Sequence, residues 1–157
     1  MSLPYTTRFP LSNQKMSTYS LVQMVVLCPA AIAAAAFDWR SRRIPNVLVV
    51  AIAVAGLVAV ALTLGSSRLP LAIGTGVAAG AACTPLYVLR GLGGGDVKLI
   101  AATSVWWSLT QLLVALTAIA LCGALLAIGY LLISRDTSHV PYGMAIAAST
   151  VGTVFLS

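Results

Sequence analysis

Glutamate is absent from this sequence, and charge of either sign is scarce. The 157 residues include nine Lys or Arg and three Asp, whereas 60% of the residues are hydrophobic. Soluble domains have roughly 45–50% apolar residues and about 25% charged residues. So little charge cannot cover the surface of a soluble protein. The composition therefore excludes an ordinary soluble domain and a disordered chain, and it indicates a protein surrounded by lipid.

Cysteine and histidine are also rare. Cys28, Cys83 and Cys122 each stand alone within an apolar run, and His139 is the single histidine. Because no Cys-x-x-Cys pair occurs, the sequence argues against a zinc site and a disulfide framework, and we expect neither a metal nor an organic cofactor. The net charge of +6 does not indicate nucleic acid as a partner. A nucleic-acid-binding surface needs clustered cations, and here they are scattered between apolar runs.

Long apolar runs dominate what is present. They follow a polar segment, residues 1–18, that we expect to form a flexible tail. The first three runs have 18 or 19 residues, close to the roughly 20 that cross a hydrocarbon core of about 30 Å. The runs cover residues 19–37, 47–64, 71–89, 97–133 and 140–156.

The run over residues 97–133 is too long for one crossing, since a helix of its 37 residues would measure about 55 Å at ~1.5 Å per residue. Its most polar point is the segment from Trp106 to Gln111, and paired tryptophans favour a membrane interface. A break there gives a short fourth helix and a long fifth helix over residues 109–133. The sequence therefore predicts an all-α fold: a polytopic membrane bundle of about six transmembrane helices, forming one domain over residues 19–157.

The cations predict the orientation of these helices. Six crossings place the segments 38–46, 90–98 and 134–139 on one side, and these segments hold six of the nine Lys and Arg residues. Cytoplasmic loops of membrane proteins are enriched in Lys and Arg. We therefore expect these three segments in the cytoplasm and both termini on the other side.

The carboxylates lie at the same predicted side. Asp38 closes the first predicted helix and Asp96 opens the fourth. Two such acids can share a proton, so that one takes a proton from water while the other polarises a peptide carbonyl. Simpler interpretations are a helix N-cap for Asp96 and an ion-pair partner of the neighbouring arginines for Asp38. We expect Asp136, beside Arg135, to be a solvated loop charge.

Helix polarity predicts which acid holds a shared proton. The partial negative charge at a helix C-terminus disfavours an ionised Asp38, and the partial positive charge at a helix N-terminus favours an ionised Asp96. We therefore expect the shared proton on Asp38, with Asp96 as the base.

Three motifs surround these acids in a fixed order. They are Asp38 with Pro45-Asn46 seven residues later, Gly93-x-Gly95-Asp96, and Val140-Pro141-Tyr142-Gly143 before an apolar run. Together they resemble the type IV prepilin peptidases, which are GxGD-type intramembrane aspartyl proteases. The resemblance covers about residues 19–156.

The resemblance implies that Asp38 and Asp96 are the catalytic pair. We also expect active-site support or substrate binding by seven residues in or beside the motifs. These are Pro45, Asn46, Gly93, Gly95, Lys98, Pro141 and Gly143.

The activity that the resemblance implies is an aspartic endopeptidase of the bacterial cytoplasmic membrane, which removes the leader of a type IV prepilin at the cytoplasmic face. Its partners would be a prepilin with a basic leader and an apolar helix, and membrane lipids. Longer family members carry a cytoplasmic domain with paired Cys-x-x-Cys motifs, associated with N-methylation of the new pilin terminus. Here the loop between the first two predicted helices has about nine residues and no cysteine. The chain is therefore similar to the short, peptidase-only form that serves Flp/Tad pili, and we expect no N-methylation.

A small proton- or cation-coupled transporter is the main alternative, since acids within a membrane also carry ions. Midplane acids and inverted repeats would favour a transporter, but both acids lie at helix ends and the sequence has no obvious repeat. A structural membrane subunit would leave the three motifs unexplained. A presenilin-like protease would leave the Ile44-Pro45-Asn46 segment unexplained.

Overall fold

The computed structural model describes residues 18–41, 43–89, 91–134 and 142–156, and every regular element within them is a helix. The first helix runs from Thr18 to Ser41 and contains a π-helical turn before α2. The elements are η1 (Gln23–Leu27), α2 (Cys28–Ser41), α3 (Asn46–Thr63), the 3₁₀ turn η2 (Ser66–Arg68), α4 (Leu69–Val88), α5 (Gly94–Ser104), α6 (Leu109–Ser134) and α7 (Tyr142–Leu156). The predicted all-α bundle of six helices is confirmed within those ranges. Residues 1–17 of the predicted tail, Asp136 and His139 lie outside the described residues.

The helices have the lengths and surfaces of membrane-spanning elements. Four of them are long and apolar enough to cross a membrane, and α7 is a shorter apolar helix. The fourth helix, α5, is short as predicted: its 11 residues span about 16 Å. Large apolar side chains such as Val47 and Leu62, each 81% exposed, cover the outside of the bundle. Lipid rather than water suits such a surface, so the chain is a multi-pass membrane protein.

The predicted break within residues 97–133 is confirmed, because α5 ends at Ser104 and α6 begins at Leu109. The two tryptophans at this break are not exposed interface anchors, however. Trp106 is 1% exposed and Trp107 is 4% exposed. Packing inside the bundle therefore holds this turn, rather than contact with lipid headgroups.

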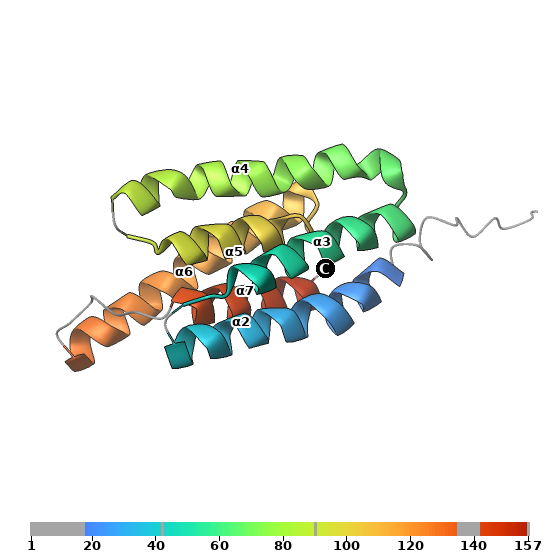
Figure 1. Ribbon diagram of the computed structural model, residues 1–157. Helices are drawn as coiled ribbons and strands as arrows, with labels where there is room; N and C mark the ends of the chain where they lie inside the picture. Colours follow the sequence, from blue (N-terminus) through green and yellow to red (C-terminus); the bar gives the residue numbers. More distant parts are fainter. Residues whose placement is uncertain (1–17, 42, 90, 135–141, 157) are drawn as a thin grey trace, which may run out of the picture.

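Successive helices alternate in direction, as Figure 1 shows. The C-terminal ends of α2 and α4 lie at the same end of the bundle as the N-terminal ends of α3, α5 and α7. The closest neighbours are α2 with α7, α4 with α5, and α6 with α7, while α5 also packs on α3. Residues 43–45 and 91–93 therefore lie at one end of the bundle, as the alternation of six helices predicts.

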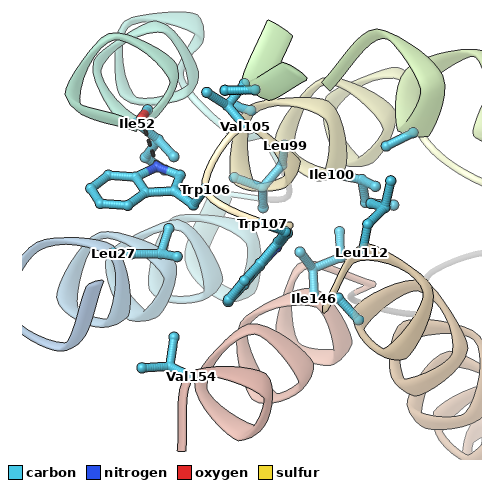
Figure 2. Close-up of a cluster of buried hydrophobic side chains, with 14 of the residues drawn as sticks. Leu27, Ile52, Leu99, Ile100, Val105, Trp106, Trp107, Leu112, Ile146 and Val154 are labelled. Carbon is cyan, nitrogen blue, oxygen red and sulfur yellow. Dashed lines mark hydrogen bonds between the residues drawn. The ribbon is translucent and has the colours of Figure 1, made fainter. Parts of the chain in front are cut away.

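Trp106 joins three helices in the core. Figure 2 shows its indole directed at α3, where Nε1 donates a hydrogen bond of 3.0 Å to the Ile52 carbonyl. A Cβ on Gly56 would lie 2.7 Å from this Nε1, so only glycine leaves room for the indole. The Trp106 carbonyl accepts hydrogen bonds from Tyr19 Oη at 2.7 Å and from Gln23 Nε2 at 2.8 Å. The first helix, α3 and the end of α5 are thereby fixed to one another.

Candidate active site

Asp38 lies near the C-terminal end of α2, and the start of α7 holds its carboxylate. The Gly143 N–H donates a hydrogen bond of 2.9 Å to Asp38 Oδ2. Gly143 is the second residue of α7, where amide N–H groups have no acceptor within the helix and stabilise a negative charge. A Cβ on Gly143 would lie 2.7 to 2.9 Å from atoms of the Asp38 side chain. This position therefore requires glycine, and α7 fixes where the half-buried carboxylate stands.

Asp96 is the third residue of α5 and is only 9% exposed. Its Oδ2 accepts a hydrogen bond of 3.1 Å from the N–H of Gly93, the residue that caps the helix. Asp96 is thus not the N-cap itself, which corrects the simpler interpretation; it bonds back to the N-cap from inside the first turn. Gly93 has φ of −73°, so its role is not a left-handed conformation. It permits close approach, since a Cβ there would lie 2.9 Å from Asp96 Oδ2.

The two acids act on each other. Asp96 lies outside the four long apolar spans. Burial raises the pKa of the Asp96 carboxyl, and the nearby negative charge of Asp38 raises it further, against the Gly93 hydrogen bond. This direction is opposite to the one that helix polarity predicts, because desolvation outweighs the positive end of α5. Asp38 also has a backbone partner outside its own helix, since the N-terminal amide of Gly143 in α7 binds its carboxylate.

The connection from α2 to α3 lies against the start of α5. Pro45 precedes α3 in an extended conformation, and its carbonyl accepts the N–H groups of the first turn of α3. Asn46 Oδ1 accepts a hydrogen bond of 3.3 Å from Lys98 Nζ. Ile44 contributes the nearest atoms to the space beside Gly95, at 3.8 Å from a Cβ built there. The Asp38-to-Asn46 motif and the Gly93-to-Asp96 motif are therefore neighbours in space.

The structure accordingly brings most of the predicted site residues to one end of the bundle. Those it joins by hydrogen bonds or packing are Asp38, Asn46, Gly93, Gly95, Asp96, Lys98 and Gly143, with Pro45 beside Asn46 in the connecting segment. Pro141 lies outside the described residues. The partner of Lys98 is Asn46, which places its ammonium on the neighbouring segment.

Tyr87 is a neighbour of the site that the sequence did not single out. Its ring would lie 3.4 Å from a Cβ on Gly94, so it packs against the glycine segment before Asp96. Nothing in the local sequence marks it, since it is one of several large residues at the end of an apolar run. The packing of α4 on α5 brings it there.

The candidate site consists of carboxylates and backbone donors. In the part of the chain that the structure describes, no three His, Cys, Asp or Glu side chains gather as a metal site would require. Two carboxylates of unequal burial, each held by a backbone N–H, suit the transfer of protons to and from a substrate.

Comparison with known proteins adds an independent observation. A family model described as the type IV leader peptidase family matches residues 25–128, a range that contains both Asp38 and Asp96. No curated protein and no solved structure matches the chain. Because the match covers well over half of the 157 residues and includes both motif acids, the chain belongs to the type IV leader peptidase family.

Proposed function

We propose that this leader peptidase is an aspartyl endopeptidase in which Asp38 and Asp96 form the catalytic pair. The observation that carries the proposal is the placement of the two acids: the end of α2 and the start of α5 lie at one end of the bundle, where the charge of Asp38 helps to raise the pKa of the buried Asp96. Each carboxylate also accepts a backbone N–H from a glycine, and a Cβ on either glycine would lie within 2.9 Å of that carboxylate.

The unequal environments assign a role to each acid. Asp96 is buried, and burial together with the charge of Asp38 raises its pKa to about 6, so we assign it the role of the acid that donates a proton. Asp38 is half-buried and accepts the Gly143 N–H in the first turn of α7, so we assign it the role of the base. This assignment reverses the one that helix polarity alone predicts.

The reaction then follows from ordinary acid–base chemistry. Asp38 takes a proton from a water molecule, whose oxygen attacks the scissile peptide carbon. Asp96 donates its proton to the carbonyl oxygen, which becomes part of a tetrahedral diol. When the C–N bond breaks, the leaving nitrogen takes a proton from Asp38 and the carboxylic acid product returns one to Asp96. The pair ends in its starting protonation state.

The proposed substrate is a type IV prepilin of the Flp type, with a basic leader and an apolar helix. The proposed location is the bacterial inner membrane, with the aspartate end of the bundle in the cytoplasm, where the cation-rich segments 38–46 and 90–98 would lie.

The connection from α2 to α3 supports the peptidase-only form, since α2 ends at Ser41 and α3 begins at Asn46. So short a segment cannot hold a cysteine-rich domain with methylation activity.

The test is cleavage of a candidate prepilin by the purified, reconstituted protein, with sequencing of the new N-terminus. Asp38→Asn and Asp96→Asn should each lower the cleavage rate by roughly 10²- to 10⁴-fold while the protein still inserts and folds. Asp136→Asn is the matched control, because it removes the remaining acid outside the motifs and should leave most activity. Retained cleavage by either of the first two variants would exclude the pair. Ion flux through proteoliposomes without cleavage would support the transporter instead.

A further inference from the structure

A cavity of about 400 Å³ lies at the end of the bundle opposite the aspartates. The start of the first helix, the end of α3, the start of α4 and the turn from α5 to α6 surround it. Its lining residues include Tyr19, Gln23, Leu64, Arg68, Leu71 and Gln111. Cavities of this size hold small ligands or the polar part of larger ones. The proposed peptidase chemistry does not use it.

The residues that line the cavity carry positive charge only. Arg68 is the cation among its lining residues, and none of those residues is acidic. A guanidinium presents several N–H donors in a planar fork that fits the oxygens of a phosphate. Such a lining favours an anion over a cation or a zwitterion.

A tight turn of the backbone at Gly65 determines the position of Arg68. Gly65 has φ of +97° and ψ of 154°, a conformation that residues with a Cβ rarely adopt. Its N–H donates to the Val60 carbonyl at 3.0 Å, and its own carbonyl accepts the Arg68 N–H at 3.1 Å. This turn ends α3, starts η2 and sets Arg68 at the cavity.

The opposite wall is fixed by hydrogen bonds of its own. Tyr19 and Gln23 both donate to the carbonyl of Trp106, the residue whose side chain Figure 2 shows in the core. Gln111 Oε1 accepts from both the N–H and the hydroxyl of Ser108. Gln111 itself is one of the residues that line the cavity. The lining of the cavity therefore has one cation and several neutral polar residues, and no acid.

The surroundings of the cavity indicate what kind of anion it takes. Leu64 and Leu71 form apolar parts of the lining, and Leu71 is 46% exposed on the outside of the bundle. The cavity lies where the membrane-spanning helices begin or end. The ends of helices that cross a bilayer meet the lipid headgroups. A ligand with a phosphate and an apolar chain matches both features.

We propose that this cavity binds the headgroup of an acidic phospholipid from the leaflet opposite the aspartate end. Arg68 would bind the phosphate, and the acyl chains would lie along the apolar surface near Leu71. The chain's own N-terminal segment is a poor occupant on charge, since residues 1–17 carry Arg8 and Lys15 and no acid.

Native mass spectrometry of the full, detergent-solubilised chain tests the proposal. The probes are phosphatidylglycerol, zwitterionic phosphatidylcholine and phosphate-free diacylglycerol, each at several concentrations. The unmodified chain should retain one phosphatidylglycerol with at least about fivefold preference over phosphatidylcholine, the value expected from one cation at a headgroup, and should not retain diacylglycerol. Arg68→Gln should abolish this preference, and Arg68→Lys should keep part of it. Arg68 is exposed, so these substitutions leave the core intact.

Arg43→Gln is the matched control, because it removes the same charge from an exposed position at the other end of the bundle. An equal loss of preference in Arg43→Gln would show that net charge alone attracts the lipid, and it would overturn the proposal. The second arm adds inorganic phosphate to the phosphatidylglycerol complex. Displacement of the lipid by millimolar phosphate would also overturn the proposal, since the site would then recognise a soluble anion.

Discussion

The two ends of this bundle are built in different ways. At the aspartate end, glycine N–H groups hold the acids: Gly143 binds Asp38, and Gly93 binds Asp96. At the other end, two side chains of the first helix converge on the carbonyl of Trp106, whose indole binds α3. Backbone donors hold a carboxylate without placing a bulky side chain beside it. The first end is therefore arranged around two acids, whereas the second fixes the helices that carry them.

The largest predicted effect is on the aspartate end. Gly143→Ala places a Cβ 2.7 to 2.9 Å from the Asp38 side chain, so the carboxylate must move. Misplacement of a catalytic group by about 1 Å can cost roughly 10²-fold in rate, and we expect a loss of that order in leader cleavage. The measurement is the cleavage rate of a prepilin by reconstituted protein.

Gly152→Ala is its control on the same helix, since nothing lies within 4 Å of a Cβ built at that position. The control should keep most activity and should not lose stability, because alanine is the better helix former. Equal losses in both variants would show that α7 tolerates no alanine at all. In that case the contact with Asp38 would not explain the result.

The next prediction concerns the packing at the opposite end of the bundle and its effect on stability. Gly56→Ala drives a Cβ to within 2.7 Å of the Trp106 indole, which is buried and cannot move aside. Overpacking of this kind costs about 1–3 kcal/mol in the free energy of unfolding. Thermal or denaturant unfolding in detergent measures it. Gly74→Ala, in open space on α4, should be neutral or slightly stabilising. Equal stability of Gly56→Ala and Gly74→Ala would show that the Trp106 indole can move aside.

A titration sharpens the comparison of the two acids. The chain has three Asp and no Glu, so Asp38→Asn combined with Asp136→Asn leaves Asp96 as the one side-chain carboxylate. Loss of the Asp38 charge should lower the pKa of Asp96 relative to the intact pair, while burial keeps it above the ordinary Asp value. Carboxyl-carbon NMR of labelled Asp in nanodiscs measures it. An Asp96 that titrates like an exposed carboxyl would overturn the assignment of the shared proton.

The number and order of the helices could be predicted because lipid imposes a simple rule on sequence. Each crossing needs about 20 apolar residues, and polar segments interrupt them. The segment from Trp106 to Gln111 marks the break between α5 and α6 even though the tryptophans pack inside the bundle. Both acids could be placed at one end for the same reason, since alternation of crossings puts Asp38 and Asp96 on the same side.

The contacts that tune the site could not be predicted in this way. Gly143 and Asp38 are separated by 105 positions, and they meet because α7 packs beside α2. The burial of Asp96 depends on how its neighbours pack around α5, which no local pattern records. Burial therefore raises the pKa of Asp96, whereas the polarity of its own helix alone predicts a lowered pKa. Helix ends are local features, whereas desolvation depends on the whole bundle.

The smallest predicted effect concerns the hydrogen bond between Asn46 and Lys98, which joins the two motif segments at the aspartate end. The bond is 3.3 Å long and exposed, so solvent screens it and side-chain entropy opposes it. A double-mutant cycle with Asn46→Ala and Lys98→Met should therefore give a coupling of about 0–1 kcal/mol in the free energy of unfolding. The same four proteins should be assayed for cleavage. If the bond only positions the connection from α2 to α3, both single variants should lower the cleavage rate alike, and the double variant should be no worse than either. A Lys98→Met variant that loses much more activity than Asn46→Ala would instead show that the ammonium contacts the substrate or the acids directly.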